Sequence, residues 1–292
     1  MKIGILAFLS EESISPAEVA RKCEALGFES LFLPEHAIIP VKHRVPYPAG
    51  DGTIPEPYAH FPDPFVGLGM AAAVTTRLKL GTGICLVNEH HPLALAKTVA
   101  TLDHLSGGRV LFGIGAGWLA DESEIMGVDF KRRWPIVRDY IRAMKELWTK
   151  SEPAYQGEFL KFPAVKMYPK PAQRPHPPIL IGAGGLGWKC ERAIKDTVEW
   201  GDGWFPVVMS PAELARHLAS MRELSAGAGR DFAKIEVSML FLQQPELQPQ
   251  DPARAVDEYS RAGVHRMVLS PPALTPGRAD AILEGLAKQY LG

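Results

Sequence analysis

The clearest pattern in the chain is a strand–helix–strand unit in its first half. Residues Leu78–Val87 form an apolar run bounded by polar positions, as expected of a strand that is buried on both faces. Pro92 then opens a helix whose apolar positions repeat at i, i+4 and i+7, namely Leu95, Val99 and Leu102. A second apolar run follows at Arg109–Ile114. This order predicts two parallel strands joined by a right-handed crossover helix.

The same alternation of strand and helix extends over the whole chain. Longer segments interrupt it after the second strand, at Ala37–Pro62, and after the fourth strand and its helix, at Ser151–Pro178. Even alternation favours an α/β fold of the (β/α)8 TIM-barrel type over a doubly wound sheet, in one domain over residues 1–292. The expected strands are Lys2–Leu9, Ser30–Pro34, Leu78–Val87, Arg109–Ile114, Ile179–Ile181, Trp204–Val208, Ile235–Leu242 and Arg266–Leu269.

Capping residues followed by proline mark the starts of several expected helices. Each such cap contributes about 1 kcal/mol, so the caps set boundaries more than overall stability. The two segments that begin Ser15-Pro16 and Ser210-Pro211 also carry glutamate at the third helical position, which predicts a reciprocal capping box. The five cap–proline pairs are Ser15-Pro16, Asp63-Pro64, Ser210-Pro211, Asp251-Pro252 and Thr275-Pro276.

Composition narrows the partners and the compartment. The chain has 292 residues and a formal net charge of −1, so nothing in its charge balance indicates binding to nucleic acid or to an anionic membrane. We therefore expect a small-molecule partner. The apolar run Ile3–Leu9 is too short for a signal or membrane-spanning segment, which predicts a cytoplasmic protein. Three scattered cysteines without CxxC spacing are expected to be buried thiols: Cys23, Cys85 and Cys190.

Glycines lie inside or at the end of three expected strands. Gly81 and Gly83 fall within the third strand, and a glycine weakens a strand unless a bulge, a bend or a close ligand needs the missing Cβ. Residues Gly113–Gly117 form a GxGxG run that is a poor match to a dinucleotide-binding fingerprint, so tight packing and ligand binding both remain open. The third run, Gly182–Gly185, precedes an expected helix and is either a tight turn or a phosphate site.

In a barrel the ligand binds at the carboxyl ends of the strands, which selects four segments: Glu35-His36, Asn88–His91, Ala116–Glu122 and Gly182–Gly185. His36 is the best acid–base candidate because imidazole titrates near neutral pH, although a histidine here can also be structural. The pair His90-His91 is a poor metal site, since adjacent strand residues point to opposite faces and no third ligand follows at suitable spacing.

The bulky segments near these strand ends suggest a covered site. Trp118 can either stack on a planar ring or close the mouth of the barrel. Residues Ala37–Pro62 show no regular pattern but contain six prolines and two tyrosines. A loop of this length is functional or disordered, and its composition favours an ordered lid.

Taken together, these segments resemble the luciferase-like oxidoreductases, especially the branch that uses the deazaflavin coenzyme F420. The resemblance extends over nearly the whole chain, through LFLPEH, TRLKLGTGICL, LAKTVATLDHLSGGRVLFGIGAGW, YPKPAQRPHPPILIGAGG and GDGWFP. Each piece is weak alone, but the combination is specific. The resemblance implies the same barrel, with a cofactor across its carboxyl-terminal mouth, and a homodimer.

The resemblance also implies roles for particular residues. A bulge with a cis peptide at Gly83-Ile84 would back the central ring of the cofactor, and His36 would be the active-site base. Trp118, beside the cofactor, replaces a glutamate of the sugar-phosphate dehydrogenases of this family, which argues against that substrate. The residues implied to hold the cofactor phosphate are Ala116, Gly117, Ala183, Gly184 and Gly185.

These expectations define a hydride-transfer enzyme. Coenzyme F420 would exchange a hydride with a small organic substrate under the lid, while His36 moves the proton and Glu35 orients His36. FMN is the alternative cofactor, in a monooxygenase that uses reduced flavin, O2 and a separate reductase. The remaining alternatives are a flavin-binding protein without catalysis and an unrelated phosphate-binding barrel. No metal is expected.

Overall fold

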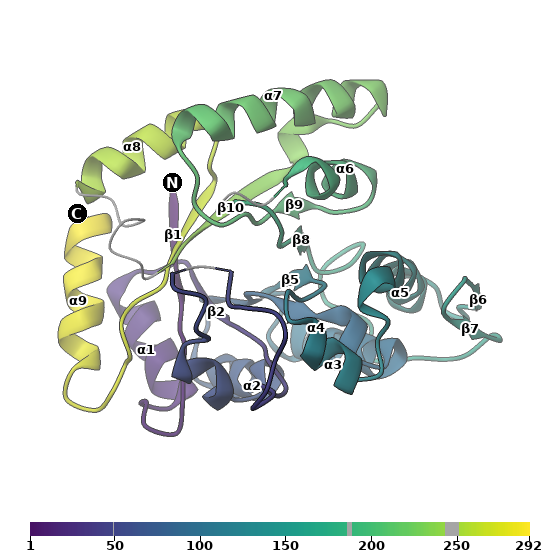
Figure 1. Cartoon of the computed structure of the whole chain (residues 1–292), viewed down its shortest axis with the longest axis horizontal. Helices are drawn as coiled ribbons and strands as arrows, with labels where there is room; N and C mark the ends of the chain where they lie inside the picture. Colours follow the sequence, from purple (N-terminus) through teal and green to yellow (C-terminus); the bar gives the residue numbers. More distant parts are fainter. Residues whose placement is uncertain (49, 186–188, 243–250) are drawn as a thin grey trace.

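The computed structural model describes residues 1–48, 50–185, 189–242 and 251–292. Parallel strands close into a barrel in the order β3-β2-β1-β11-β10-β9-β8-β5-β4, with β3 also pairing with β5. Figure 1 shows the helices around this barrel and the two chain ends side by side. The barrel strands are β1 (Lys2–Leu6), β2 (Ser30–Leu33), β3 (Lys79–Thr82), β4 (Cys85–Leu86), β5 (Val110–Gly115), β8 (Ile179–Ile181), β9 (Gly203–Trp204), β10 (Glu236–Phe241) and β11 (Arg266–Leu269).

The predicted (β/α)8 TIM barrel is confirmed. Its third strand consists of two parts, β3 and β4. The expected strand Leu78–Val87 is interrupted at Gly83-Ile84, a cis peptide bond, and pairing with β5 resumes at Cys85. With β3 and β4 counted together, the barrel has eight strands. One helix after each strand covers the outside: α1 (Pro16–Leu26), α2 (Pro64–Val74), α3 (Pro92–Leu105), α5 (Arg133–Thr149), α6 (Glu191–Glu199), α7 (Pro211–Gly227), α8 (Pro252–Ala262) and α9 (Ala279–Tyr290).

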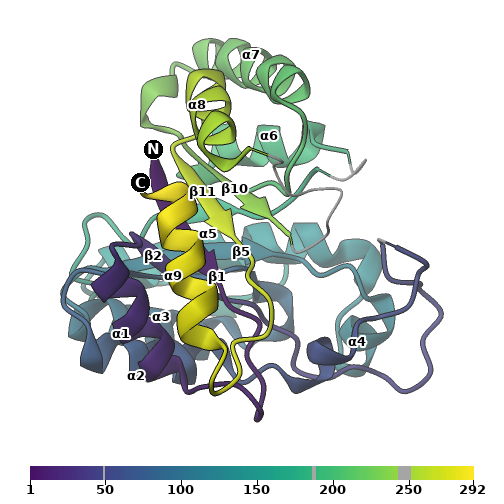
Figure 2. The same ribbon diagram turned by 90° about the vertical axis from the view of Figure 1, so that its left-hand side faces the viewer.

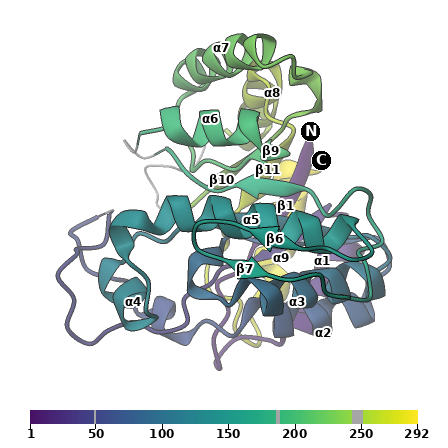
Figure 3. The same cartoon turned by 90° about the vertical axis from the view of Figure 1, so that its right-hand side faces the viewer.

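Additional elements lie where the alternation is interrupted. The segment after β2 contains the short helix η1 (Glu56–His60) and runs beside α4 (Ala120–Ile125), as Figure 2 shows. A small hairpin of β6 (Tyr155–Gln156) and β7 (Lys161–Phe162) packs outside α5, as Figure 3 shows. The Tyr155 hydroxyl donates a hydrogen bond to Asp139 of α5 at 2.7 Å. The other short helices are η2 (Val87–Glu89), η3 (Phe130–Arg132) and η4 (Phe232–Lys234).

Side-chain caps mark where four of the described α-helices begin: α1, α2, α7 and α8. The Ser15–Glu18 capping box of α1 is complete, and Asp63 and Asp251 cap α2 and α8. At α7 only half of the predicted box forms, because the Ser210 hydroxyl accepts from the Glu213 amide without a reciprocal bond. The prediction for the last helix is wrong: Thr275-Pro276 opens a turn, and α9 begins at Ala279.

Apolar side chains fill the barrel interior and form the floor of its carboxyl-terminal mouth. These buried side chains come from strands on all sides of the barrel, and Phe8, Ile84 and Leu240 pack on them. A second, larger core lies between the sheet and the helices and includes the thiols of Cys23, Cys85 and Cys190, which are buried as predicted. Among the described residues, no helix is both long enough and apolar enough to cross a membrane. The interior cluster consists of Leu6, Phe32, Leu111, Leu180, Phe205 and Val268.

Candidate active site

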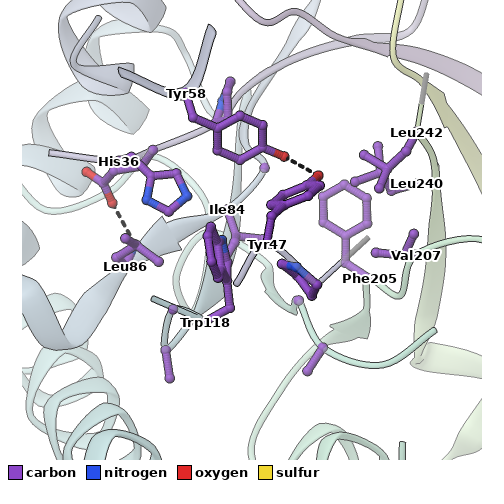
Figure 4. Close-up of a pocket in the computed structure, with 18 of the residues that line it drawn as sticks. His36, Tyr47, Tyr58, Ile84, Leu86, Trp118, Phe205, Val207, Leu240 and Leu242 are labelled. Atoms are coloured by element: carbon purple, nitrogen blue, oxygen red, sulfur yellow. Dashed lines mark hydrogen bonds between the residues drawn. The ribbon is translucent and has the colours of Figure 1, made fainter. Parts of the chain in front are cut away.

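A pocket of about 580 Å³ opens at the carboxyl ends of the barrel strands. This is the end at which TIM barrels build their sites. Figure 4 shows His36 on one side, Phe205, Val207 and Leu240 on the opposite side, and Ile84 between them. The pocket brings together nearly all the predicted site residues: Glu35, His36, Gly83, Ile84, Ala116, Gly117, Trp118, Ala183 and Gly184.

The Gly83-Ile84 bulge explains the glycines on the neighbouring strands. A Cβ on Gly115 or Gly182 would overlap the side chain of Ile84, and a Cβ on Gly113 would overlap a backbone carbonyl of β3. A Cβ on Gly83 would lie 2.8 Å from the Leu6 side chain. The packing interpretation therefore accounts for Gly113 and Gly115, and it does so through strand–strand contact around the bulge.

The other glycines shape the turns that follow the strands. Gly117 and Gly184 have φ values of 74° and 93°, which L side chains rarely adopt. Gly185 does not line the pocket and packs on the backbone of Val207 instead. The glycine run also does not lead directly into a helix, since α6 begins only at Glu191; part of the predicted helix start, residues 186–188, lies outside the described residues.

His36 is held by a carboxylate that the sequence analysis did not single out. Its Nδ1 lies 2.5 Å from Oε2 of Glu122, and the two side chains are 6% and 1% exposed. The other oxygen of Glu122 accepts from the backbone amides of Ala37 and Ile38 at 3.0 and 3.4 Å. Because Glu122 acts as the acceptor in these contacts, His36 Nδ1 is the donor. The Nε2 atom of His36 has no hydrogen-bond partner among the described residues.

The predicted orienting role of Glu35 is wrong. One of its oxygens accepts from the Leu86 amide at 2.6 Å, and the other lies 2.8 Å from Nε2 of His90. Glu35 therefore links the end of β2 to β4 and η2 rather than to His36. Burial by itself lowers the pKa of His90, but the hydrogen bond and charge of Glu35 outweigh it and raise that pKa.

The histidine pair that raised the question of a metal is not on a strand. His90 is the C-cap residue of η2 and His91 is the N-cap residue of α3, and the side chain of His90 contacts Glu35. Ligand atoms of Glu35, Cys85 and His90 do lie within 4.8 Å of one another. However, both Glu35 oxygens are already hydrogen-bonded, and burial raises the pKa of the Cys85 thiol well above its usual range. This chemistry opposes the thiolate that a zinc ligand set needs.

A third carboxyl group lies close to Glu122. Oε1 of Glu89 accepts from the Ser123 hydroxyl at 2.7 Å, whereas its Oε2 is buried without a partner among the described residues. Burial, and then the charge of Glu122, raise the pKa of Glu89 to about 7. Glu89, next to the His36–Glu122 pair, therefore changes its protonation state close to neutral pH.

Aromatic rings surround His36. Tyr58 and Trp118 lie 5.4 and 5.8 Å from its ring, and Tyr47 meets Trp118 edge-on at 5.5 Å. The Tyr47 and Tyr58 hydroxyls are hydrogen-bonded at 2.8 Å, as Figure 4 shows. Burial, with a smaller contribution from Tyr47, raises the pKa of Tyr58. Trp118 thus lines the pocket and packs against the loop at its mouth.

That loop is fastened to α4, the helix that carries Glu122. The backbone amide and Nε of Arg44 donate to Asp121 at 3.0 and 2.8 Å, and Nη2 of Arg44 donates to Glu124 at 2.5 Å. The described part of the segment Ala37–Pro62 therefore lies over the site in contact with α4. This arrangement fits the predicted lid.

The sequence matches the luciferase-like monooxygenase family over residues 12–280. The chain belongs to this family. The predicted resemblance is therefore confirmed, and the family supports an oxidoreductase. Within this luciferase-like protein, the site described above lies in the barrel that the family shares.

Proteins similar to this luciferase-like protein include an uncharacterized protein, an F420-dependent dehydrogenase and a monooxygenase. Uncharacterized protein Rv0953c of Mycobacterium tuberculosis is 38% identical over 289 residues, which cover 98% of each chain. F420-dependent glucose-6-phosphate dehydrogenase of Kineococcus radiotolerans is 28% identical over 270 residues, which cover 88% of this chain and 71% of the dehydrogenase. The crystal structure of monooxygenase RslO1 from Streptomyces bottropensis superposes with a TM-score of 0.75 at 23% identity, covering 100% of this chain and 99% of RslO1; this shows the shared fold.

Proposed function

We propose that this protein transfers a hydride between coenzyme F420 and a small organic substrate. The observation that carries the proposal is the His36–Glu122 pair, with Nε2 of His36 unpartnered beside a pocket whose wall is the Gly83-Ile84 bulge. Such an arrangement provides a proton acceptor and donor next to a surface for a flat ring. The F420-dependent relative from Kineococcus radiotolerans, which is similar over 88% of this chain, supports the same cofactor.

The residues present fit a tricyclic ring with a phosphate. Gly83 and Ile84 would back the ring, and Trp118 would lie at its edge. The turns at Ala116-Gly117 and Ala183-Gly184 leave backbone groups exposed to the pocket for the phosphate end. When bound, a deazaflavin supplies the two-electron redox chemistry, and the protein contributes positioning and electrostatics.

The role of His36 follows from its hydrogen bonds. Glu122 holds Nδ1, so Nε2 can accept the hydroxyl proton of an alcohol while the C–H hydride of that alcohol passes to the cofactor and a carbonyl forms. In the reverse direction Nε2 returns the proton to the oxygen. The loop that carries Tyr47 and Tyr58 reduces the access of water to this step.

The part of the pocket around His36 favours neutral substrates. Trp118 places an apolar ring near His36, and around His36 the pocket wall is made of Tyr47, Tyr58 and Phe61. Alcohols, ketones and enones suit such a surface better than a sugar phosphate does. A homodimer remains part of the proposal, and the exposed side chains of Val66 and Met70 on α2 offer apolar surface for it.

The second candidate is an FMN-dependent monooxygenase supplied with reduced flavin by a separate reductase. The family match favours a monooxygenase, because the family is described as luciferase-like monooxygenases. Both cofactors are phosphorylated three-ring systems, so the turns around the pocket fit either. The third candidate, flavin binding without catalysis, is opposed by the buried His36–Glu122 pair, which a passive binding site does not need.

Fluorescence titration of the purified protein with F420 and, separately, with FMN tests these alternatives. We expect micromolar binding of F420 and much weaker binding of FMN, followed by a change in F420 absorbance when alcohols or enones are added. Preference for FMN, with oxygen consumed in the presence of reduced FMN, would favour the monooxygenase. Binding of neither compound would refute the cofactor assignment.

A further inference from the structure

Two cationic side chains line the pocket after neighbouring barrel strands. Arg133 stands at the start of α5, after β5, and Lys189 precedes α6, after β8. β5 and β8 pair directly, whereas His36 follows β2. No ion pair joins either side chain to an acidic group within the described part of the chain. The pocket lining therefore carries two positive charges without acidic partners after these two strands.

The guanidinium of Arg133 is oriented without being neutralised. It lies over the Phe130 ring, with Cζ 3.8 Å from the ring centroid, and Nη1 donates to the Phe130 carbonyl at 2.9 Å. Nε is buried and has no hydrogen-bond partner in the described residues. A buried donor on a charged group that lacks a partner is costly. A ligand that supplies an acceptor here removes this cost.

Neighbouring arginines show that an unpaired guanidinium is not the rule in this region. Arg132, the preceding residue, pairs with Glu158, and Arg138 on the next turn of α5 pairs with Asp196. Arg44 of the loop has two acidic partners. Arg133 is the arginine of this group that lines the pocket, and it is the one without an acid. Its missing partner is therefore expected to come from the bound ligand.

We propose that Arg133 and Lys189 bind a multiply charged anionic tail attached to the ring held at Ile84. The proposal rests on the proposed function and names the part of the cofactor that would lie here: the carboxylates of the F420 tail, beyond the phosphate that the turns at Ala116-Gly117 and Ala183-Gly184 would hold. A bidentate guanidinium suits phosphate and carboxylate oxygens, and the ammonium of Lys189 adds a second positive charge. FMN carries one phosphate and no further acids, so this end of the pocket would discriminate between the two cofactors.

Binding measurements with and without the tail test the proposal. The probes are F420 and its tail-less analogue 8-hydroxy-5-deazariboflavin, titrated by fluorescence into the wild-type protein and into Arg133→Gln, Lys189→Gln and Arg132→Gln. We expect Arg133→Gln to weaken F420 binding about tenfold or more and Lys189→Gln to weaken it less, because Phe130 orients Arg133 for a bidentate contact, whereas Lys189 is exposed and provides a single point charge. The affinity of both variants for the analogue should stay within about twofold of the wild type. The affinity of the control Arg132→Gln for F420 should also stay within about twofold.

Salt provides a second readout that does not depend on turnover. Raising the ionic strength from 0.05 to 0.5 M should weaken F420 binding to the wild-type protein more than binding to Arg133→Gln, since exposed charge interactions are screened. Arg133→Gln could lose the same affinity for F420 and for the analogue, or lose affinity for neither. Either result would overturn the tail site and leave the cofactor assignment intact. Failure of the wild-type protein to bind either compound would overturn both. Circular dichroism of each variant shows whether it folds, and Lys189→Gln tests the site independently of Arg133.

Discussion

Two histidine–glutamate pairs lie at the carboxyl end of the same barrel, yet they differ in what surrounds them. His36 and Glu122 are joined at 2.5 Å, and His90 and Glu35 at 2.8 Å. His36 lines the pocket and its second nitrogen lacks a protein partner in the described structure. His90 does not line the pocket, and its side chain is 30% exposed. Similar hydrogen bonds therefore serve two different purposes.

The difference follows from what each carboxylate holds besides its histidine. Glu122 binds two amides at the start of the loop, so it fixes His36 and the entrance to the pocket together. Glu35 binds the amide of Leu86, the residue that ends β4, and so fastens the strand segment after the bulge. Glu35 and His90 thus hold the wall of the pocket in place, and the proposed function assigns the proton transfer to the first pair.

Replacing His36 should produce the largest effect. His36→Ala removes the proposed proton acceptor, and we expect turnover with F420 to fall by about 10²- to 10⁴-fold while the affinity for F420 changes little. Steady-state kinetics and fluorescence titration measure the two quantities. His90→Ala is the matched control and should retain most of the turnover. Equal turnover in His36→Ala and the wild-type protein would remove His36 from the mechanism.

Glu122→Gln tests the carboxylate of the same pair. The amide can still meet the backbone donors of the loop, but it no longer favours the proton on Nδ1 of His36, so we expect turnover to fall about 10²-fold. The pH profile of turnover should also move, which a purely structural role would not require. Glu124→Gln, two positions farther along α4 and bonded to Arg44, is the control. An unchanged pH profile in Glu122→Gln would contradict a positioning role.

The contact between Glu122 and His36 could not be predicted from the sequence. His36 was predictable because it follows a strand, and strand ends in a barrel converge on one mouth. The bulge was indicated by the glycines inside the expected strand Leu78–Val87, and its cis peptide was implied by the family resemblance. Glu122 lies in the first turn of α4, between Asp121 and Glu124, and the sequence does not tell which of the three acids faces inward. Only the packing of α4 against the loop selects Glu122, which is 1% exposed, for this position.

The fold could be predicted further than the site, with errors at specific boundaries. Strands β8 and β11 match their predicted limits because turn residues enclose short apolar runs. The first strand ends at Leu6, although Ala7 and Leu9 are buried, because hydrophobicity reports burial and not strand pairing. After Thr275-Pro276, Gly277 adopts a φ of 81° and delays the helix to Ala279. Local patterns therefore gave the elements, and tertiary contacts set their ends.

Glu35→Gln tests whether the Glu35–His90 pair stabilises the fold. We expect the free energy of unfolding to fall by about 3 kcal/mol, because the buried partner of His90 loses its charge, while turnover per folded molecule remains close to that of the wild type. Urea unfolding followed by fluorescence measures the first quantity. A double-mutant cycle with His90→Gln should give a coupling free energy between the two residues. A large loss of turnover without loss of stability would return Glu35 to the catalytic group.

The smallest expected effect concerns Glu89, the carboxyl group that lies near both pairs. Its pKa rises to about 7 in the folded protein, first through burial and then through the charge of Glu122. The folded state therefore holds a proton that the unfolded chain releases near its ordinary pKa of 4.5, and stability falls as the pH rises from about 4.5 to 7. Glu89→Gln removes this loss, so relative to the wild type the variant should gain about 1–2 kcal/mol between pH 5 and pH 8. Urea unfolding at both pH values measures the difference, with the exposed Glu12→Gln as the control. If Glu89→Gln instead lost stability relative to the wild type as the pH rises, the ionised Glu89 would stabilise the fold. The buried, unpartnered Oε2 of Glu89 would then not destabilise the folded protein.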